Sequence, residues 1–461
     1  MRLQIAKPGE HVAMVNWPFL ERLDDWTSPG LAEVAGLHRH VVRLVESGDI
    51  TYVVKELPDN LAEREWRLLR ELGDAGLPTA EVVGVVTQRN PDSEIDGLLI
   101  TRNIDYSLPY RVLLSGRGLR VPYLGERLLD ALAGLLVRLH LAGFYWGDCS
   151  LSNTLFRRDA GELSAYIIDV ETGEHHPTLS DGQRKHDLTI ATENVAGDLE
   201  DLQAGGRLAE GIDPISTALA IETTYDRLWK ELTGTDEFDV NETFRIDNRL
   251  QRLHELGFDA AELELYTTAD GSKLRLIPRV VEHGFHGQRL KTLTGLETGE
   301  NQARRLLNDI ARYRAVIEKQ TLKKVPETVA AARWLDERFE PTIDGVPPDL
   351  VGKLEPAELY HQVLEHLWFL SEVAGGDVGL GEAVTSYVRD VLTQLTDEHR
   401  TVAKASDHDE WTLDDWAAEG WAVAEESEGD NATESARQSA TDDATDDATD
   451  NAKNNAEGGT A

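Results

Sequence analysis

The segment from residue 40 to 57 contains two short runs rich in β-branched and other apolar residues, HVVRLVE and ITYVVKEL. Between them, residues 47–49 read Ser-Gly-Asp, which is typical of a tight turn. The pattern therefore predicts a β-hairpin. Because side chains alternate between the two faces of a strand, Lys55 shares one face with Val53 and Leu57. A lysine on an apolar face is costly unless it meets a carboxylate or an anionic ligand.

A helix follows this hairpin, beginning near Pro58 and ending at Gly73. At about 100° per residue, Glu65 falls on its apolar stripe, whereas Glu63 points to the opposite side. The stripe consists of Leu61, Glu65, Leu68, Leu69 and Leu72. A strand lysine followed by a helix glutamate on the buried side is the arrangement by which kinases hold the α- and β-phosphates of ATP. If Lys55 and Glu65 are considered alone, an incidental ion pair at a domain edge explains them equally well.

A second apolar helix leads into another cluster of polar residues. Apolar side chains from 128 to 139 recur at helical spacing, and Gly143 is suited to end the helix. The next loop contains Asp148 and, five residues later, Asn153. A short strand, a turn and a second strand ending in Ile-Ile-Asp then bring Asp169 beside that loop.

This order of elements matches the catalytic loop and the metal-binding strand of kinases. In kinases the Asp of D-x-x-x-x-N accepts the proton of the attacking hydroxyl, the Asn binds magnesium, and the Asp after the next hairpin binds magnesium too. A lone D-x-x-x-x-N occurs by chance, but the helix, glycine, loop, hairpin and Ile-Ile-Asp in this order are more specific. Preceded by Lys55 and Glu65, they predict a phosphoryl-transfer site.

Beyond this region the chain divides into two further blocks and a tail. Residues 215–325 are expected to form an α+β domain, since a hairpin pattern stands there among helical stretches. Residues 326–423 have a mostly helical pattern, and the acidic segment 424–461 is expected to be disordered. The expected fold class is therefore α+β, with a two-lobed protein-kinase-like domain over residues 25–205 preceding these parts.

Composition narrows the class of partner. The chain of 461 residues has 84 acidic and 46 basic side chains and a formal net charge of −38. Nucleic acid and anionic lipid repel such a polyanion, so neither is an expected partner. Cys149 is the sole cysteine, which excludes an intramolecular disulfide. Because no signal-peptide pattern or membrane-spanning apolar run is present, we expect a cytoplasmic protein without membrane insertion.

The catalytic-loop region resembles that of the lipopolysaccharide kinase (Kdo/WaaP) family, which belongs to the protein-kinase-like superfamily. The stretch L-H-x-x-G…G-D-x-x-x-x-N of that family is matched here by Leu139, His140, Gly143, Gly147, Asp148 and Asn153. The resemblance covers roughly residues 25 to 200. The whole chain is similar to bacterial proteins in which such a domain precedes a C-terminal domain of unknown function.

The resemblance implies a role for each polar residue of the predicted site. Lys55 would bind the phosphates of ATP and Glu65 would hold Lys55. Asp148 would be the base, with Asn153 and Asp169 as magnesium ligands. His140 of the same stretch would be structural, with hydrogen bonds near the backbone of the metal site.

Several features of protein kinases are absent from this sequence. No G-x-G-x-x-G precedes Lys55, and only Gly30 and Gly36 stand in that region. Asp169-Val-Glu171 replaces Asp-Phe-Gly, and no A-P-E motif follows, which argues against a platform for peptide substrates. Glu171 is better explained as surface charge than as a metal ligand.

Other residues with reactive side chains have simpler explanations. Cys149 adjoins the proposed base but is expected to be a small buried filler, and Trp146 occupies a packing position. Four histidines lack the spacing of a recognised metal site and are expected to be packed or solvated: His38, His40, His175 and His176.

Two functions follow from these observations. The first is an ATP- and Mg²⁺-dependent phosphotransferase that acts on a hydroxyl of a sugar, a metabolite or a protein. The alternative is a pseudokinase, a nucleotide-binding or scaffold module without phosphotransfer. The missing glycine motif favours the pseudokinase. The sequence also retains Lys55 and Glu65 together with Asp148, Asn153 and Asp169. This favours the enzyme, since a scaffold has no physical need for all five residues.

The predicted disorder of the tail can be tested by truncation. From Glu425 onward the chain has eleven acidic and two basic residues, and no apolar side chain larger than alanine. Such a segment cannot bury enough surface to offset its chain entropy. Truncation after Val423 should therefore leave the calorimetric unfolding transition unchanged within error. A clear loss of stability would show that the tail packs against a folded domain.

Overall fold

The computed structural model describes residues 1–27, 31–33, 40–48, 50–89, 95–114, 124–209, 211–233, 236–239, 263–267, 273–278, 284–376 and 378–395. The predicted disordered tail, the turn at residues 269–272, and Gly30 and Gly36 lie outside these residues. No helix within the described ranges is long and apolar enough to cross a membrane.

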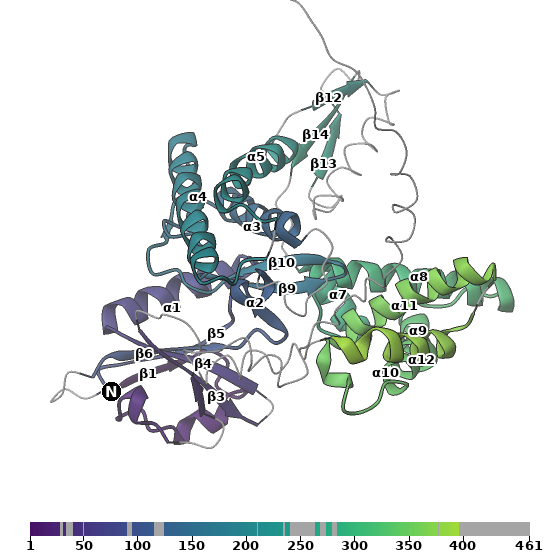
Figure 1. Ribbon diagram of the computed structural model, residues 1–461, viewed down its shortest axis with the longest axis horizontal. Coiled ribbons are helices and arrows are strands. Elements are labelled where there is room, and N and C mark those ends of the chain that lie inside the picture. The colour runs from purple at the N-terminus through teal and green to yellow at the C-terminus, as the bar shows by residue number, and fades with distance from the viewer. Residues whose placement is uncertain are drawn as a thin grey trace, which may run out of the picture. The chain divides into compact units, whose positions relative to one another are not determined.

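The first lobe is built on a six-stranded antiparallel sheet with the order β1-β5-β6-β4-β3-β2 (Figure 1). Its strands are β1 (Arg2–Ile5), β2 (Leu31–Glu33), β3 (Val41–Ser47), β4 (Ile50–Leu57), β5 (Val82–Thr87) and β6 (Gly97–Arg102). Strands β3 and β4 form the hairpin that the sequence predicts. Their register places Lys55 opposite Val42 on one side and Leu99 on the other.

Helix α1 (Asp59–Asp74) packs against β5 and β6 of this sheet. The side chains that it buries are Ala62, Glu65, Leu68, Leu69 and Leu72. Glu63 stays outside with a side chain that is 45% exposed. Four of the five residues of the predicted stripe are therefore buried, including Glu65 as the inward-facing acid, whereas Leu61 is only partly buried.

The N-terminal segment covers the opposite face of the sheet. A separate core forms there from Met14, Phe19, Leu23, Trp26, Tyr52, Val54, Ile100 and their neighbours. Arg89, which is 1% exposed, fastens this segment by donating hydrogen bonds to Glu56 and to the carbonyl of Phe19. The sheet therefore has an apolar core on both faces, with α1 on one and the N-terminal segment on the other.

The second lobe is mainly helical. Its helices are α2 (Tyr110–Leu114), α3 (Leu124–Leu141), α4 (Asp181–Ala204) and α5 (Pro214–Thr233). Short strands β7 (Ser107–Pro109), β9 (Thr154–Asp159) and β10 (Glu162–Ile167) form a sheet in the order β10-β9-β7, and β8 (Phe144–Tyr145) pairs with β11 (Glu174–His175). One apolar core joins the inner face of α1 to α3, α4 and α5.

The glycine predicted to end the second helix does so. Helix α3 ends at Leu141, and Gly143 has a φ of +78°, in the left-handed region that favours glycine. A side chain at this position would also collide with the backbone of His176. The chain therefore leaves α3 sharply and enters the loop that carries Asp148.

The remaining described elements form a small sheet and a set of helices. Strands β12 (Asp236–Asp239), β13 (Leu263–Thr267) and β14 (Lys273–Pro278) lie in the order β12-β14-β13. The helices are α7 (Phe285–Thr294), α8 (Glu300–Thr321), α9 (Glu327–Trp334), α10 (Glu340–Asp344), α11 (Pro356–Ala374) and α12 (Leu380–Asp390). Short turns of 3-10 helix occupy Val12–Asn16, Leu23–Asp25, Val351–Lys353 and Leu392–Gln394, and a π-helix spans Leu335–Phe339. The predicted α+β class, a kinase-like domain followed by a mostly helical C-terminal region, is confirmed.

The turn between β9 and β10 is bound by these C-terminal helices. Asp159, which is 1% exposed, accepts hydrogen bonds from the backbone N–H groups of Asn301 (3.1 Å) and Gln302 (2.6 Å) in the first turn of α8. Arg157 forms an ion pair with Glu355, which stands immediately before α11 (2.5 Å). A buried carboxylate from the kinase-like domain thus caps a helix of the C-terminal region.

Replacement of this buried cap should destabilise the protein. In Asp159→Ala the two N–H groups of α8 lose their acceptor, and that of Gln302 stays buried without one, at a cost of roughly 2 kcal/mol. We expect a lower midpoint of thermal unfolding, measured by calorimetry. Asp336→Ala, which removes an exposed carboxylate from the same C-terminal region, is the control and should have almost no effect. Equal midpoints for the two variants would contradict a capping role for Asp159.

Candidate active site

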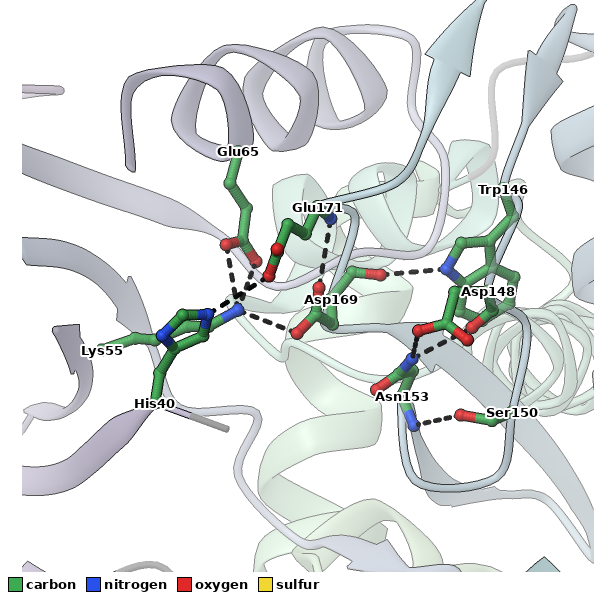
Figure 2. A network of polar contacts seen from close by, with 9 residues as sticks. All are labelled: His40, Lys55, Glu65, Trp146, Asp148, Ser150, Asn153, Asp169 and Glu171. Carbon is green, nitrogen blue, oxygen red and sulfur yellow. Dashed lines mark hydrogen bonds and ion pairs between the residues drawn. The ribbon is translucent and has the colours of Figure 1, made fainter. Parts of the chain in front are cut away.

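The ammonium group of Lys55 is shared between two carboxylates (Figure 2). Its Nζ atom lies 3.0 Å from Oε2 of Glu65 on α1 and 2.8 Å from Oδ2 of Asp169, which follows β10. The side chain of Lys55 is only 14% exposed and that of Glu65 only 1%. Strand β4, helix α1 and the end of β10 therefore converge on one buried positive charge.

Burial and charge act against each other within this triad. The pKa of Glu65 is raised to about 7, because burial and the nearby charge of Asp169 raise it more than the attraction to Lys55 lowers it. Burial also disfavours the charged form of Lys55, but attraction to Glu65 and Asp169 outweighs it and raises the pKa of the ammonium group. The lysine therefore stays positively charged, and it can release one carboxylate without losing the other.

Asp148 and Asn153 contact each other within the loop between β8 and β9. The Nδ2 atom of Asn153 donates to Oδ2 of Asp148 and to the backbone carbonyl of Asp148, both at 3.0 Å. Burial raises the pKa of Asp148; Asn153 opposes this shift and the charge of Asp169 adds to it. In Figure 2 the amide oxygen of Asn153 points away from Asp148.

Asp169 is held by hydrogen bonds on both its backbone and its side chain. Its carbonyl accepts a hydrogen bond from Nε1 of Trp146 (2.9 Å), and its Oδ1 accepts one from the backbone N–H of Glu171 (3.1 Å). The neighbouring Ile168 N–H donates to the carbonyl of Asn153 (3.2 Å). The backbones that carry the two predicted magnesium ligands are therefore joined directly.

The structure brings the residues predicted from the sequence together in two groups, and the members of each group contact one another. Lys55, Glu65 and Asp169 form one group and Asp148 with Asn153 forms the other. The groups are near enough for the charge of Asp169 to act on Asp148. This is the arrangement that the order of motifs in the sequence predicts.

Helix α4 supplies three further site residues that the sequence analysis did not identify. Asp187, Asn194 and Asp198 are separated by seven and then four residues, so they lie on one face of the helix. The helical spacing of these three polar residues is the feature of the sequence that could have revealed them. A polar stripe on a helix usually faces solvent, whereas here it faces the loop that carries Asp148.

Asp187 binds the start of the loop that carries Asp148. Fully buried, it accepts hydrogen bonds from the backbone N–H groups of Trp146 and Gly147, both at 2.8 Å. Nε2 of His140 lies 3.0 Å from the same carboxylate, and its Nδ1 lies 2.7 Å from the hydroxyl of Tyr225. His140 has the structural place that the resemblance implies, although it reaches the loop backbone through Asp187.

Asp198 and Asn194 bind the rest of the loop. Asp198 accepts hydrogen bonds from the backbone N–H groups of Leu151 (2.9 Å) and Ser152 (3.2 Å), and from the Ser152 hydroxyl (2.7 Å). Asn194 donates to Oδ1 of Asp148 (3.0 Å) and to the carbonyl of Cys149 (3.2 Å). Helix α4 thus contacts the loop along most of its length.

The expectation that Glu171 is a surface charge is wrong. Its side chain is 17% exposed and lies 3.3 Å from Nε2 of His40, which is 14% exposed. His40 is accordingly a packed histidine, as expected, and His38 lies outside the described residues. The pair links the start of β3 to the segment after Asp169 (Figure 2).

Trp146 and Cys149 occupy the packing positions predicted for them. Both side chains are fully buried. Burial, together with the neighbouring carboxylates, raises the pKa of the Cys149 thiol well above its usual value, so the nucleophilic thiolate is disfavoured.

The donor set fits a magnesium ion bound together with phosphate. Within the described part of the chain, no group of three or more His, Cys, Asp or Glu residues is arranged to hold a metal alone. Magnesium at nucleotide sites, however, usually takes one or two protein ligands plus phosphates and water. Asp169 and Asn153 provide such a pair. The charge of Asp169 raises the pKa of both Asp148 and Glu65, so these carboxylates lie close enough to repel one another.

These two lobes and this site define a protein-kinase-like domain. Two family models match the chain. The lipopolysaccharide kinase (Kdo/WaaP) family matches residues 33–195, and a domain of unknown function, DUF4032, matches residues 227–392. The chain therefore carries a lipopolysaccharide kinase (Kdo/WaaP) family domain followed by a DUF4032 domain.

Many solved structures match this chain, and one of them illustrates the degree of likeness. It is described as WaaP in complex with acyl carrier protein, and the match has 18% sequence identity and a TM-score of 0.35. The match covers 56% of this chain and 99% of that chain. No curated protein matches this chain.

The two glutamates of α1 allow a matched test of the lysine partner. Glu65→Ala should weaken Mg-ATP binding by about tenfold or more, because Lys55 loses the buried carboxylate that fixes its position. Glu63→Ala removes an exposed carboxylate from the same helix and should change the dissociation constant by less than about twofold. Calorimetric titration with Mg-ATP measures the dissociation constants of both variants. Equal effects of the two substitutions would contradict the assignment of Glu65 as the partner of Lys55.

Proposed function

We propose that this chain is an ATP- and magnesium-dependent phosphotransferase that uses a hydroxyl group as the acceptor. The kinase family of its first domain supports a phosphotransferase. The observation that carries the proposal is Lys55 bound to both Glu65 and Asp169, with Asp148 and Asn153 in the adjoining loop. This is the constellation that kinases use to position a phosphoryl group.

In this proposal Lys55 exchanges one anionic partner for another. It stays bound to Glu65 and moves from Asp169 to the α- and β-phosphates of ATP. The exchange frees Oδ2 of Asp169 for a metal ion, and the ammonium group remains paired throughout. The buried position of Glu65 fixes where that ammonium group can lie.

Asp169 and the amide oxygen of Asn153 would hold magnesium. The ion supplies positive charge against the phosphate oxygens while the phosphoryl group is transferred. Asp148 accepts the proton of the acceptor hydroxyl. At the same time the hydroxyl oxygen bonds to the γ-phosphorus, and the bond between that phosphorus and the departing ADP breaks.

Two aspartates separate the phosphotransferase from a pseudokinase. Asp169→Ala should abolish most of the stabilisation that Mg-ATP gives to the folded protein, measured as a thermal shift, because a metal ligand is lost. Asp148→Asn should retain that shift and lose roughly 100-fold or more of the turnover, because a general base is lost. Turnover is followed as ATP consumption with panels of sugar, metabolite and protein acceptors.

Each alternative has its own outcome in this experiment. A pseudokinase would show the Mg-ATP shift and its loss in Asp169→Ala, without any acceptor-dependent turnover. Because stabilisation grows with the logarithm of ligand concentration over the dissociation constant, the titration should extend to millimolar Mg-ATP. No shift at that concentration would contradict a nucleotide site at Lys55.

A further inference from the structure

Asn194 is the residue of α4 that touches the side chain of the proposed base. Its Nδ2 atom donates to Oδ1 of Asp148 at 3.0 Å and to the carbonyl of Cys149 at 3.2 Å. By contrast, Asp187 and Asp198 contact the loop at backbone N–H groups and at the hydroxyl of Ser152. Asn194 thus differs from its two neighbours on the helix face in the kind of group it holds.

The carboxylate of Asp148 is bound by one amide on each oxygen. Asn153 donates to Oδ2 and Asn194 donates to Oδ1. With a single amide the carboxylate plane could turn about its Cβ–Cγ bond, but amides on both oxygens fix that plane. Each oxygen also has a second lone pair, so the carboxylate can still accept a proton from an acceptor hydroxyl.

We infer that Asn194 is a positioning residue for the base, setting the carboxylate plane of Asp148 for the acceptor hydroxyl. The inference rests on the proposed function for its catalytic meaning, and on the two hydrogen bonds for its structural content. A base acts efficiently only when its lone pair is aimed at the proton that it removes.

The rest of the loop does not depend on Asn194. Four backbone N–H groups of the loop, at Trp146, Gly147, Leu151 and Ser152, are bound by Asp187 and Asp198. Asn194 contributes the bonds to Asp148 and to the carbonyl of Cys149. Its removal should therefore disturb the orientation of Asp148 more than the path of the loop.

Crystal structures of two variants test the positioning directly. In Asn194→Ala the loop backbone should stay in place, while the Asp148 carboxylate turns or adopts more than one orientation. Glu193→Ala removes the exposed neighbouring side chain on α4 and should leave Asp148 as it is. If the Asp148 side chain in Asn194→Ala keeps the orientation of the parent protein at full occupancy, the inference is overturned. If that variant does not fold, Asn194→Leu, which keeps a similar shape without a donor or a charge, decides the same point.

Kinetics then test the catalytic consequence. We expect kcat to fall about tenfold or more in Asn194→Ala, and by a similar factor in Asn194→Leu, with little change in KM for ATP or in the Mg-ATP thermal shift. Glu193→Ala should match the parent in all of these. A parent-like kcat in Asn194→Ala would overturn the role in catalysis. If the parent protein itself consumes no ATP, the proposed function fails, while the crystal structures still decide whether Asn194 orients Asp148.

Discussion

The structure of this site depends on one buried ammonium group that two carboxylates share. Lys55 projects from the sheet of the first lobe, Glu65 from the helix packed on that sheet, and Asp169 from the end of a hairpin in the second lobe. The charges of Lys55 and Glu65 are buried and need a partner at this depth, whereas the side chain of Asp169 is 32% exposed. The triad therefore fixes the distance between the lobes at the point where a nucleotide would bind.

The other half of the site is held by hydrogen bonds to backbone. Helix α4 binds the loop that carries Asp148 through Asp187 and Asp198. The loop then continues into the β9–β10 hairpin, which begins one residue after Asn153 and ends two residues before Asp169. The turn of that hairpin is capped against α8 by the buried Asp159. The C-terminal region therefore contacts the element whose two ends carry the proposed metal ligands.

The sequence was most informative where periodicity and burial agree. The 2-residue period of β4 and the helical stripe of α1 predicted the side chains that point inward, including Lys55 and Glu65. It was least informative where a polar side chain is buried by a distant segment. Glu171 pairs with His40, 131 positions away, and Asp159 caps a helix 142 positions away. The polar face of α4 was missed because such a stripe usually meets solvent.

The claim that Lys55 exchanges Asp169 for the phosphates of ATP is tested most directly by a crystal structure with Mn²⁺ and a non-hydrolysable ATP analogue. The account predicts that Lys55 contacts the α- and β-phosphates while it keeps its ion pair with Glu65. It also predicts an anomalous manganese peak bound by Asp169 and Asn153. A nucleotide bound elsewhere, or Lys55 still paired with Asp169 and no manganese beside it, would contradict the account.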